Sequence, residues 1–509
     1  MLQFDPGPVG PFLRDKLNKY EFSPQVYEYG TVESCSDDIV QVAGLPHSRY
    51  GELLEFENDA YGLALDLRLD GVGTVLLSKG NEVSAGSLVK GTGRTADICV
   101  GPELLGRVID PIGRPLDGRE LHAAEYRPVE NPAPSIMHRM PVSRPLETGI
   151  LAVDSMIPIG RGQRELIIGD RQTGKTSIAL SAMLNQRGKD VICIYCSIGQ
   201  KASTVAGLVH TLSETGAMEQ TVVVSSTAGD SSAMQYLAPY AGCSIAEKFM
   251  LEGKDVLIVY DDLSKHAVAY RAISLLLRRP SGREAYPGDV FYLHSRLLER
   301  AAKLDDALGG GSITALPIVE TMAGDISAYI PTNVISITDG QIYLESELFH
   351  AGIRPAVNVG LSVSRVGRAA QHSAMKQVSG SLRLDVAQYR DMAVFAQFGA
   401  DIDSTTAKLL QRGERLTELL KQPQDQILSL AEQVSILTAY AKDCFSGLTV
   451  KEVAPYRAEL LLYLKRNYSD IFETINTTGD FGEGGKEVLE KAIAQFAADY
   501  GEKANAKHQ

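Results

Sequence analysis

The sequence predicts a multidomain chain with a small N-terminal β-barrel, a central phosphate-loop α/β nucleotide-binding domain and a C-terminal helical domain. Short strands separated by glycine-rich turns fill residues 27–90, strands and helices alternate from 165 to 278, and convincing strands are absent beyond about 372. We place the boundaries at 1–25 (irregular segment), 26–92 (barrel), 93–371 (nucleotide-binding domain) and 372–509 (helical domain).

Composition excludes several classes of protein. The chain has 509 residues and a net charge of −13, which argues against a broad grip on nucleic-acid phosphates. It contains no apolar run of about 18 residues, and Met1–Pro6 lacks the features of a signal peptide. Cys193 and Cys196 lie three apart on a predicted strand and so face opposite sides; we expect small buried residues rather than a metal or redox pair.

The barrel prediction rests on strand length and turn chemistry. Turn signals such as Asn58-Asp59 and Asp70-Gly71 separate apolar runs of four to six residues. Such spacing suits a closed barrel, which has no free edges. The predicted strands are 30–33, 39–42, 51–56, 62–67 and 73–77.

The central and C-terminal elements follow from periodicity. Alternation of strand and helix predicts a mainly parallel sheet covered on both faces. Its predicted strands are 165–169, 190–198, 221–225, 255–260, 313–318 and 333–338, and its predicted helices are 174–185, 202–216, 231–251 and 263–278. The predicted helices of the C-terminal domain are 374–397, 403–421, 427–445, 451–466 and 485–500.

The central domain is organised around a phosphate loop. The pattern G-x-x-x-x-G-K-[ST] lies between a predicted strand and a predicted helix, which is the context it requires. Loop amides and the helix N-terminus would face phosphate oxygens, Lys175 would reach the outer phosphates, and the Thr176 hydroxyl would hold Mg²⁺. The loop residues are Gly169, Asp170, Arg171, Gln172, Thr173, Gly174, Lys175 and Thr176.

Two further positions bear on catalysis. The apolar strand 255–260 ends at Asp261, a Walker B pattern that supports Mg²⁺ directly or through water. Gln200 follows the strand 190–198; glutamine can hydrogen-bond a water molecule but is a poor proton acceptor. If Gln200 faces the γ-phosphate, the site binds Mg-ATP and turns it over slowly or not at all. Spacing alone leaves that placement open, with Glu320 and Asp262 as alternative bases.

Longer motifs resemble one family over roughly residues 25–480. Together they are similar to the alpha subunit of F-type ATP synthase, with its RecA-like nucleotide-binding core. The matching stretches are 171–177, 260–265, 280–284, 288–292, 331–341, 353–355 and 361–367.

The resemblance implies a ring of three alpha and three beta chains around a rotating gamma chain, with delta and peripheral-stalk subunits. It implies that Gly169–Ser177 bind the phosphates of ATP or ADP, and that Asp261 supports Mg²⁺. Gln200 would stand where the catalytic paralogue has its glutamate. Arg354, Pro355, Gln422 and Gln424 would border the adenine.

The resemblance also implies that Arg365 acts in trans as an arginine finger in the beta site, an effect worth about 10³–10⁵ in rate in comparable enzymes. Ser362 resembles a position required for cooperative turnover. The expected location is the cytoplasmic face of a bacterial cell membrane, touched only through the ion-translocating sector, with no nucleic acid as partner.

Two alternatives come from other classes of protein. A self-sufficient hexameric export ATPase would have glutamate at the position of Gln200. A ring-shaped RNA helicase would expose basic and aromatic residues on the barrel, whereas residues 27–90 are acidic on balance with few aromatics.

Overall fold

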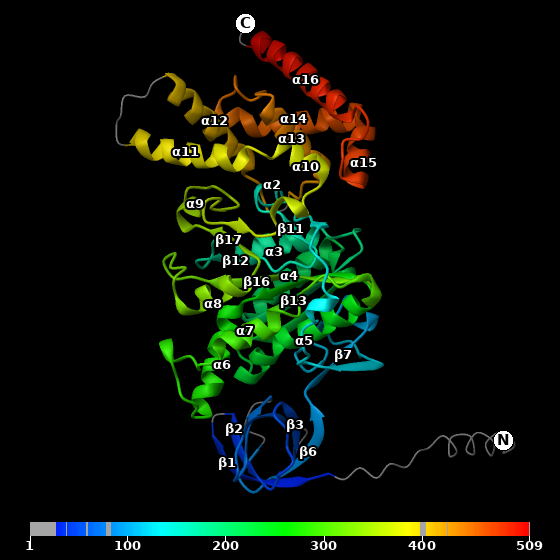
Figure 1. Cartoon of the computed structure of the whole chain (residues 1–509), viewed down its shortest axis with the longest axis vertical. Helices are drawn as coiled ribbons and strands as arrows, with labels where there is room; N and C mark the ends of the chain where they lie inside the picture. The colour runs from blue at the N-terminus through cyan, green and yellow to red at the C-terminus, as the bar shows by residue number, and fades with distance from the viewer. Residues whose placement is uncertain are drawn as a thin grey trace, which may run out of the picture. The chain divides into compact units, whose positions relative to one another are not determined.

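The computed structural model describes residues 27–36, 38–57, 60–77, 83–397, 404–424 and 426–507 (Figure 1). The predicted irregular segment 1–25 lies outside these residues. The chain divides into two compact units, Met1–Thr95 and Ala96–Gln509.

The first unit is a closed antiparallel barrel, with strands in the order β1-β2-β5-β4-β3-β6 within the described part. Alternate side chains point inward, and Val40, Leu54, Leu76 and Val89 are fully buried. The strands are β1 Tyr29–Ser36, β2 Ile39–Ala43, β3 Glu52–Phe56, β4 Tyr61–Leu67, β5 Val72–Leu76 and β6 Leu88–Thr95. β6 was not among the predicted strands; it pairs with both β1 and β3 and so closes the barrel.

The second unit is built on a sheet whose order, over the described residues, is β18-β17-β12-β16-β15-β13-β14-β8. All neighbouring pairs are parallel except β17 and β18. Its strands are β8 Val108–Ile109, β12 Leu166–Gly169, β13 Val191–Gln200, β14 Thr221–Thr227, β15 Asp255–Asp261, β16 Ser312–Glu320, β17 Gly340–Leu344 and β18 Val363–Ser364. Short strand pairs flank it: β7 Asp97–Val100 with β9 Glu125–Pro128, and β10 Pro145–Leu146 with β11 Ile159–Gly160.

Helices cover both faces of this sheet. Cys193 of β13 contacts Met183 of α3, whereas Cys196 lies against Gly242 of α5, so the two thiols face opposite sides and both are buried. The helices of this region are α2 Leu151–Met156, α3 Lys175–Leu184, α4 Ala202–Glu214, α5 Ser232–Leu251, α6 Leu263–Leu276, α7 Val290–Leu298, α8 Tyr329–Ile337 and α9 Ser346–His350. Short 3₁₀ helices are Pro102–Leu104, Ile136–His138, Ala217–Gln220, Arg283–Ala285, Asp306–Leu308 and Gly367–Ala370.

The predicted strand 333–338 is wrong, because residues 333–337 belong to helix α8. Ile330, Val334 and Ile337 are buried, and their spacing of four and three places them on one helical face. Pro331 lies in the first turn, where a missing amide proton costs no helical hydrogen bond. The strand instead follows at Gly340–Leu344, and pairs with β12.

The C-terminal part is helical, as predicted, with two differences in its elements. The predicted helix 374–397 is divided at 379–381 around Gly380, and α15 was not predicted. Gly479, in the left-handed region at φ 72°, ends α15. The helices are α10 Ser373–Val378, α11 Leu382–Gln397, α12 Ser404–Leu420, α13 Leu430–Ala441, α14 Val450–Asn467, α15 Ser469–Thr478 and α16 Gly485–Lys507.

Among the residues that the structure describes, none of the helices is long and apolar enough to span a bilayer.

Candidate nucleotide-binding site

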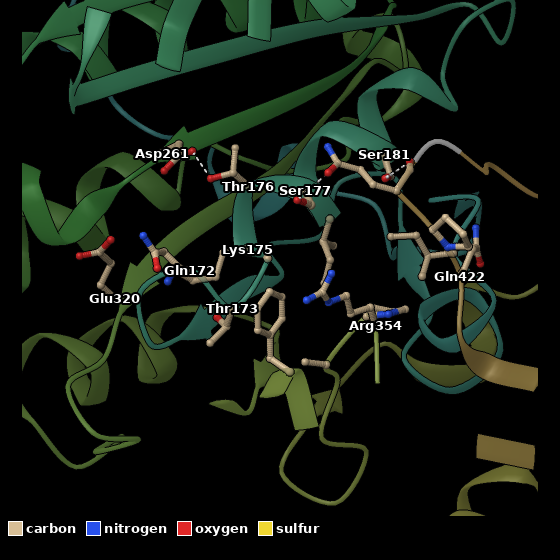
Figure 2. Close-up of a pocket in the computed structure, with 18 of the residues that line it drawn as sticks. Gln172, Thr173, Lys175, Thr176, Ser177, Ser181, Asp261, Glu320, Arg354 and Gln422 are labelled. Carbon is tan, nitrogen blue, oxygen red and sulfur yellow. Dashed lines mark hydrogen bonds between the residues drawn. The ribbon is translucent and has the colours of Figure 1, made fainter. Parts of the chain in front are cut away.

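A cavity of about 590 Å³ opens at the carboxyl ends of the parallel strands, where open α/β sheets hold their ligands (Figure 2). The β12–α3 loop and the start of α3 form one wall, and segments 349–356 and 422–424 form another. The residues lining it are Ile150, Gln172, Thr173, Gly174, Lys175, Thr176, Ser177, Ile178, Ser181, Gln200, Asp261, Glu320, Phe349, Arg354, Pro355, Ala356, Gln422, Pro423 and Gln424.

The loop before α3 has the geometry of an anion-binding turn. Gly174 precedes the helix in the left-handed region at φ 96°. A Cβ on Gly169 would lie 2.5 Å from the carbonyl oxygen of Leu344, so only glycine fits between the strand ends. The first amides of α3 lack helical partners and border the cavity, which therefore attracts negative charge.

Lys175 is a buried cation at the base of this loop. Its Nζ donates to the carbonyl oxygens of Gly169 (2.9 Å) and Asp170 (2.5 Å). Burial lowers the pKa of Lys175, although the nearby Glu320 and aspartates oppose that effect. Anionic phosphate oxygens would be better partners than these neutral carbonyls.

Gly169, Asp170 and Arg171 are predicted to hold phosphate but do not line the cavity, and Asp170 instead holds the loop in place. The Asp170 carboxylate accepts hydrogen bonds from Thr321 Oγ1 (2.6 Å), the Gly324 amide (2.9 Å) and Ser346 Oγ (3.0 Å). Burial raises the pKa of Asp170, but these hydrogen bonds outweigh burial and the net shift is downward.

Asp261 is the meeting point of the polar side chains at the strand ends. Its Oδ2 accepts from Thr176 Oγ1 at 2.7 Å and from the Tyr195 hydroxyl at 2.6 Å, and its Oδ1 accepts from Gln200 Nε2 at 2.9 Å. Burial, and then the charge of Asp261, raise the pKa of Tyr195, so its hydroxyl remains a donor. A hydroxyl beside a carboxylate is a hard oxygen pair of the kind that Mg²⁺ prefers when phosphates complete its ligands, so these residues fit the ion.

The two alternative bases differ in position. Asp262 is 1% exposed, does not line the cavity and caps α6 by accepting from the Lys265 amide at 2.7 Å. Burial raises the pKa of Asp262 to about 6. Glu320 lines the cavity, but its carboxylate is paired with Arg171 Nε at 2.9 Å. At the cavity, Asp261 therefore has the uncharged Gln200 beside it. The Glu320 carboxylate is engaged by Arg171.

The far end of the cavity is formed by segments 349–356 and 422–424. Arg354 lies 4.4 Å from the ring centroid of Phe349. Gln424 Oε1 accepts from Ser177 Oγ at 3.1 Å, which links this end to α3. Ile150 and Phe349 line this end and were missed, because no local pattern distinguishes them from other apolar residues; only the fold brings them to the cavity.

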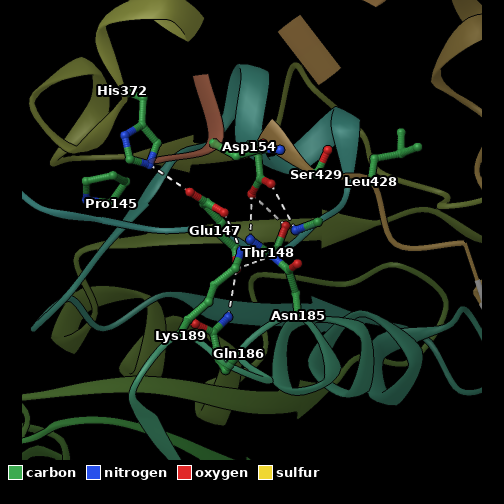
Figure 3. A network of polar contacts seen from close by, with 12 residues as sticks. Pro145, Glu147, Thr148, Asp154, Asn185, Gln186, Lys189, His372, Leu428 and Ser429 are labelled. Carbon is green, nitrogen blue, oxygen red and sulfur yellow. Dashed lines mark hydrogen bonds and ion pairs between the residues drawn. The ribbon is translucent and has the colours of Figure 1, made fainter. Parts of the chain in front are cut away.

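Gln422 connects the cavity to a polar network beneath it. Its Oε1 accepts from the Leu151 amide (3.0 Å), and its Nε2 donates to the Gly149 carbonyl (2.7 Å). Below, the carboxylate of Asp154 accepts from Thr148 (Figure 3). It also accepts from the Gly149 amide and from Gln433 of α13. This network therefore joins the nucleotide-binding and helical parts of the second unit.

A second acidic centre lies in the same network. Glu147 pairs with His372 at 2.8 Å and with Lys189 (Figure 3). Burial would raise the pKa of Glu147, but His372 and Lys189 lower it to about 2.

Ser362 and Arg365 do not line the cavity. Ser362 is buried; its Oγ donates to the Asn358 carbonyl (2.6 Å) and accepts from the Tyr343 amide (2.9 Å). Arg365 is exposed, directly after β18 at the end of the sheet, and its amide donates to the Asp339 carbonyl. The predicted site residues thus lie at the cavity or in the loop beside it, except for Ser362 and Arg365, which lie on either side of β18.

Comparisons with known proteins agree with this architecture. Residues 149–364 match the nucleotide-binding domain model of the ATP synthase alpha/beta family, and residues 371–496 match the C-terminal domain model of its alpha/beta chains.

Full-length relatives are similarly consistent. ATP synthase subunit alpha of Acetivibrio thermocellus is 59% identical over 97% of this chain and 98% of its own length. The subunits alpha of Caldanaerobacter subterraneus and Clostridium botulinum are each 56% identical, over 98% and 97% of this chain and 99% and 98% of their own lengths. The chain therefore belongs to the ATP synthase alpha/beta family, and within it to the alpha subunits.

Proposed function

We propose that this chain is the regulatory, non-catalytic alpha subunit of a proton- or sodium-translocating rotary ATP synthase. It binds Mg-ATP or Mg-ADP in the cavity and supplies Arg365 to the catalytic site of a neighbouring beta subunit. The observation that carries the first part is Gln200, which lines the cavity and donates to Asp261. An amide cannot take the proton of an attacking water, so bound nucleotide is held rather than cleaved.

Different residues of the cavity bind different parts of the Mg-nucleotide. Lys175 and the first amides of α3 bind phosphate oxygens, and the segment around Arg354 and Gln424 borders the base. Thr176 and Asp261 hold Mg²⁺, which neutralises phosphate charge when bound. Gln200 positions water near the outer phosphate without deprotonating it.

The proposal for Arg365 rests on its position. Its side chain is exposed and outside the cavity, at an edge of the sheet, so its guanidinium is available to another chain. The preceding residue is anchored: Ser364 Oγ donates to the Pro158 carbonyl (2.7 Å) and accepts from the Gly367 amide (3.1 Å). Such anchoring suits a group that must be presented in one geometry.

The proposed partners follow from the family. The chain would alternate with beta subunits in a ring of three of each, surround a gamma subunit and connect with delta and the peripheral stalk. It would lie at the cytoplasmic face of a bacterial membrane and meet that membrane through the ion-translocating sector.

Nucleotide binding is tested with Lys175→Ala in the full chain. Loss of a charge-assisted contact should weaken Mg-ATP binding by about 10- to 100-fold, measured by calorimetric titration. Lys451→Ala, which removes an exposed lysine of α14, is the control. Unchanged affinity in Lys175→Ala would overturn the site, and substantial turnover by the isolated wild-type chain would overturn the non-catalytic assignment.

A further inference from the structure

Tyr195 is a buried phenol that contacts the candidate metal site from inside the protein. It lies on β13, is 2% exposed and does not line the cavity. Its hydroxyl donates to Asp261 Oδ2 at 2.6 Å. A short hydrogen bond from a buried hydroxyl to a carboxylate is among the stronger kinds in proteins.

The other described donors to the Asp261 side chain are of a different kind. Thr176 donates to the same Oδ2, and Gln200 donates to Oδ1. Both line the cavity, so both are free to turn toward a bound ligand. Tyr195 belongs to the buried core together with residues of α3, so it cannot turn toward a ligand in the cavity.

A carboxylate held by one immobile donor keeps its orientation while its other partners rearrange. Residues that hydrogen-bond to a metal-supporting carboxylate commonly fix its orientation. Their removal reduces metal affinity by about 10- to 100-fold. We propose that Tyr195 is a positioning residue that fixes Asp261 and thereby sets the affinity of this site for Mg²⁺ bound with nucleotide. This inference rests on the proposed binding of Mg-nucleotide in the cavity.

The alternative role for Tyr195 is purely structural, since a buried hydroxyl needs an acceptor. The two roles differ in what they change. A structural role affects nucleotide binding equally with and without metal, whereas a positioning role affects only the gain that metal provides.

The test compares Tyr195→Phe with the wild-type full chain. ATP is titrated calorimetrically in excess Mg²⁺ and again in EDTA, and the ratio of the two affinities is the readout. Tyr195→Phe should lower this ratio about tenfold or more while the affinity in EDTA stays unchanged. Titration of Mn²⁺ in the presence of ATP, followed by the electron paramagnetic resonance of free Mn²⁺, should show the same loss.

Tyr260→Phe is the matched control. Tyr260 is 1% exposed on the adjacent strand β15, precedes Asp261 and therefore points to the opposite face of the sheet. Its ratio should equal that of the wild type.

The inference would be overturned by an unchanged ratio in Tyr195→Phe, by an equal loss of affinity with and without Mg²⁺, or by the same fall of the ratio in Tyr260→Phe. These results are distinct from failure of the proposed function, which would show as no nucleotide binding by the wild-type chain. A wild-type affinity that is independent of Mg²⁺ would also overturn the inference.

Discussion

At the scale of single residues, the chemistry of the cavity depends on the side chain at the end of β13. Gln200 and Asp261 are joined by a 2.9 Å hydrogen bond in which the glutamine amide is the donor. A glutamate here would place a second negative charge and a proton acceptor beside Asp261, where the present site has the neutral Gln200 amide. Under the proposed function, the Gln200 amide is therefore the group that makes the cavity hold nucleotide rather than hydrolyse it.

His294 provides a prediction about pH. It is fully buried, both ring nitrogens lack hydrogen-bond partners among the described residues, and its ring lies 5.4 Å from that of His266. Burial lowers the pKa of His294 from 6.5 to about 4. The unfolded chain therefore binds a proton that the folded chain refuses between these values, and stability falls as the pH drops through this window.

His294→Phe should reduce the slope of the unfolding free energy against pH by ~1.4 kcal/mol per pH unit, which corresponds to one proton. Urea unfolding followed by far-ultraviolet circular dichroism at several pH values between 8 and about 4.5 measures this slope. His210→Phe, which changes an exposed histidine of α4, is the control and should keep the wild-type slope. The same slope in His294→Phe and the wild type would show that this histidine is not the titrating group.

At the scale of elements, the buried network around Asp154 fastens α2 to α13. Asp154 Oδ2 accepts from the Gly149 amide (2.9 Å) and from Gln433 Nε2 (2.8 Å). Burial raises the pKa of Asp154 despite these donors. The Gly149 carbonyl also accepts from Gln422, which lines the cavity. Gly149 therefore links the Asp154 network to the cavity.

Asp154→Ala should destabilise the chain by about 1–3 kcal/mol, because it leaves buried donors without an acceptor. It should also increase amide hydrogen exchange in α2 and in the first turn of α13. Asp391→Ala on α11 removes an exposed carboxylate and is the control, with no change in either measurement expected. Wild-type exchange in α13 would mean that Asp154 does not fasten these helices.

At the scale of the whole molecule, Arg365 is presented at an edge of the sheet, away from the cavity of its own chain. A functional arginine in that position requires a neighbouring chain to complete a site. The proposed activity is thus a property of the assembled ring rather than of one subunit.

Arg365→Ala should leave Mg-ATP binding to this chain intact and lower steady-state hydrolysis in a ring reconstituted with beta and gamma subunits by about 10³-fold or more. The binding measurement separates loss of the arginine from misfolding. Arg368→Ala, an exposed arginine three positions along, is the control. Normal turnover in the Arg365→Ala ring would remove the proposed role in trans.

The sequence by itself determined the three-part architecture and the phosphate-loop end of the cavity. Strand and helix periods are local properties, and the glycines, Lys175 and Thr176 of the loop act through backbone geometry within eight consecutive residues. The sequence also predicted the position of Asp261 at the cavity, since parallel strands end at a common edge of the sheet.

Only the tertiary structure decided which distant side chains meet. It put 333–337 into a helix, because burial of Ile330, Val334 and Ile337 on one face outweighed their preference for strands. It also brought Phe349 and Ile150 to the cavity and the Tyr195 hydroxyl to Asp261. Such contacts join residues far apart in the chain, where no local period specifies the partner, so packing alone selects them.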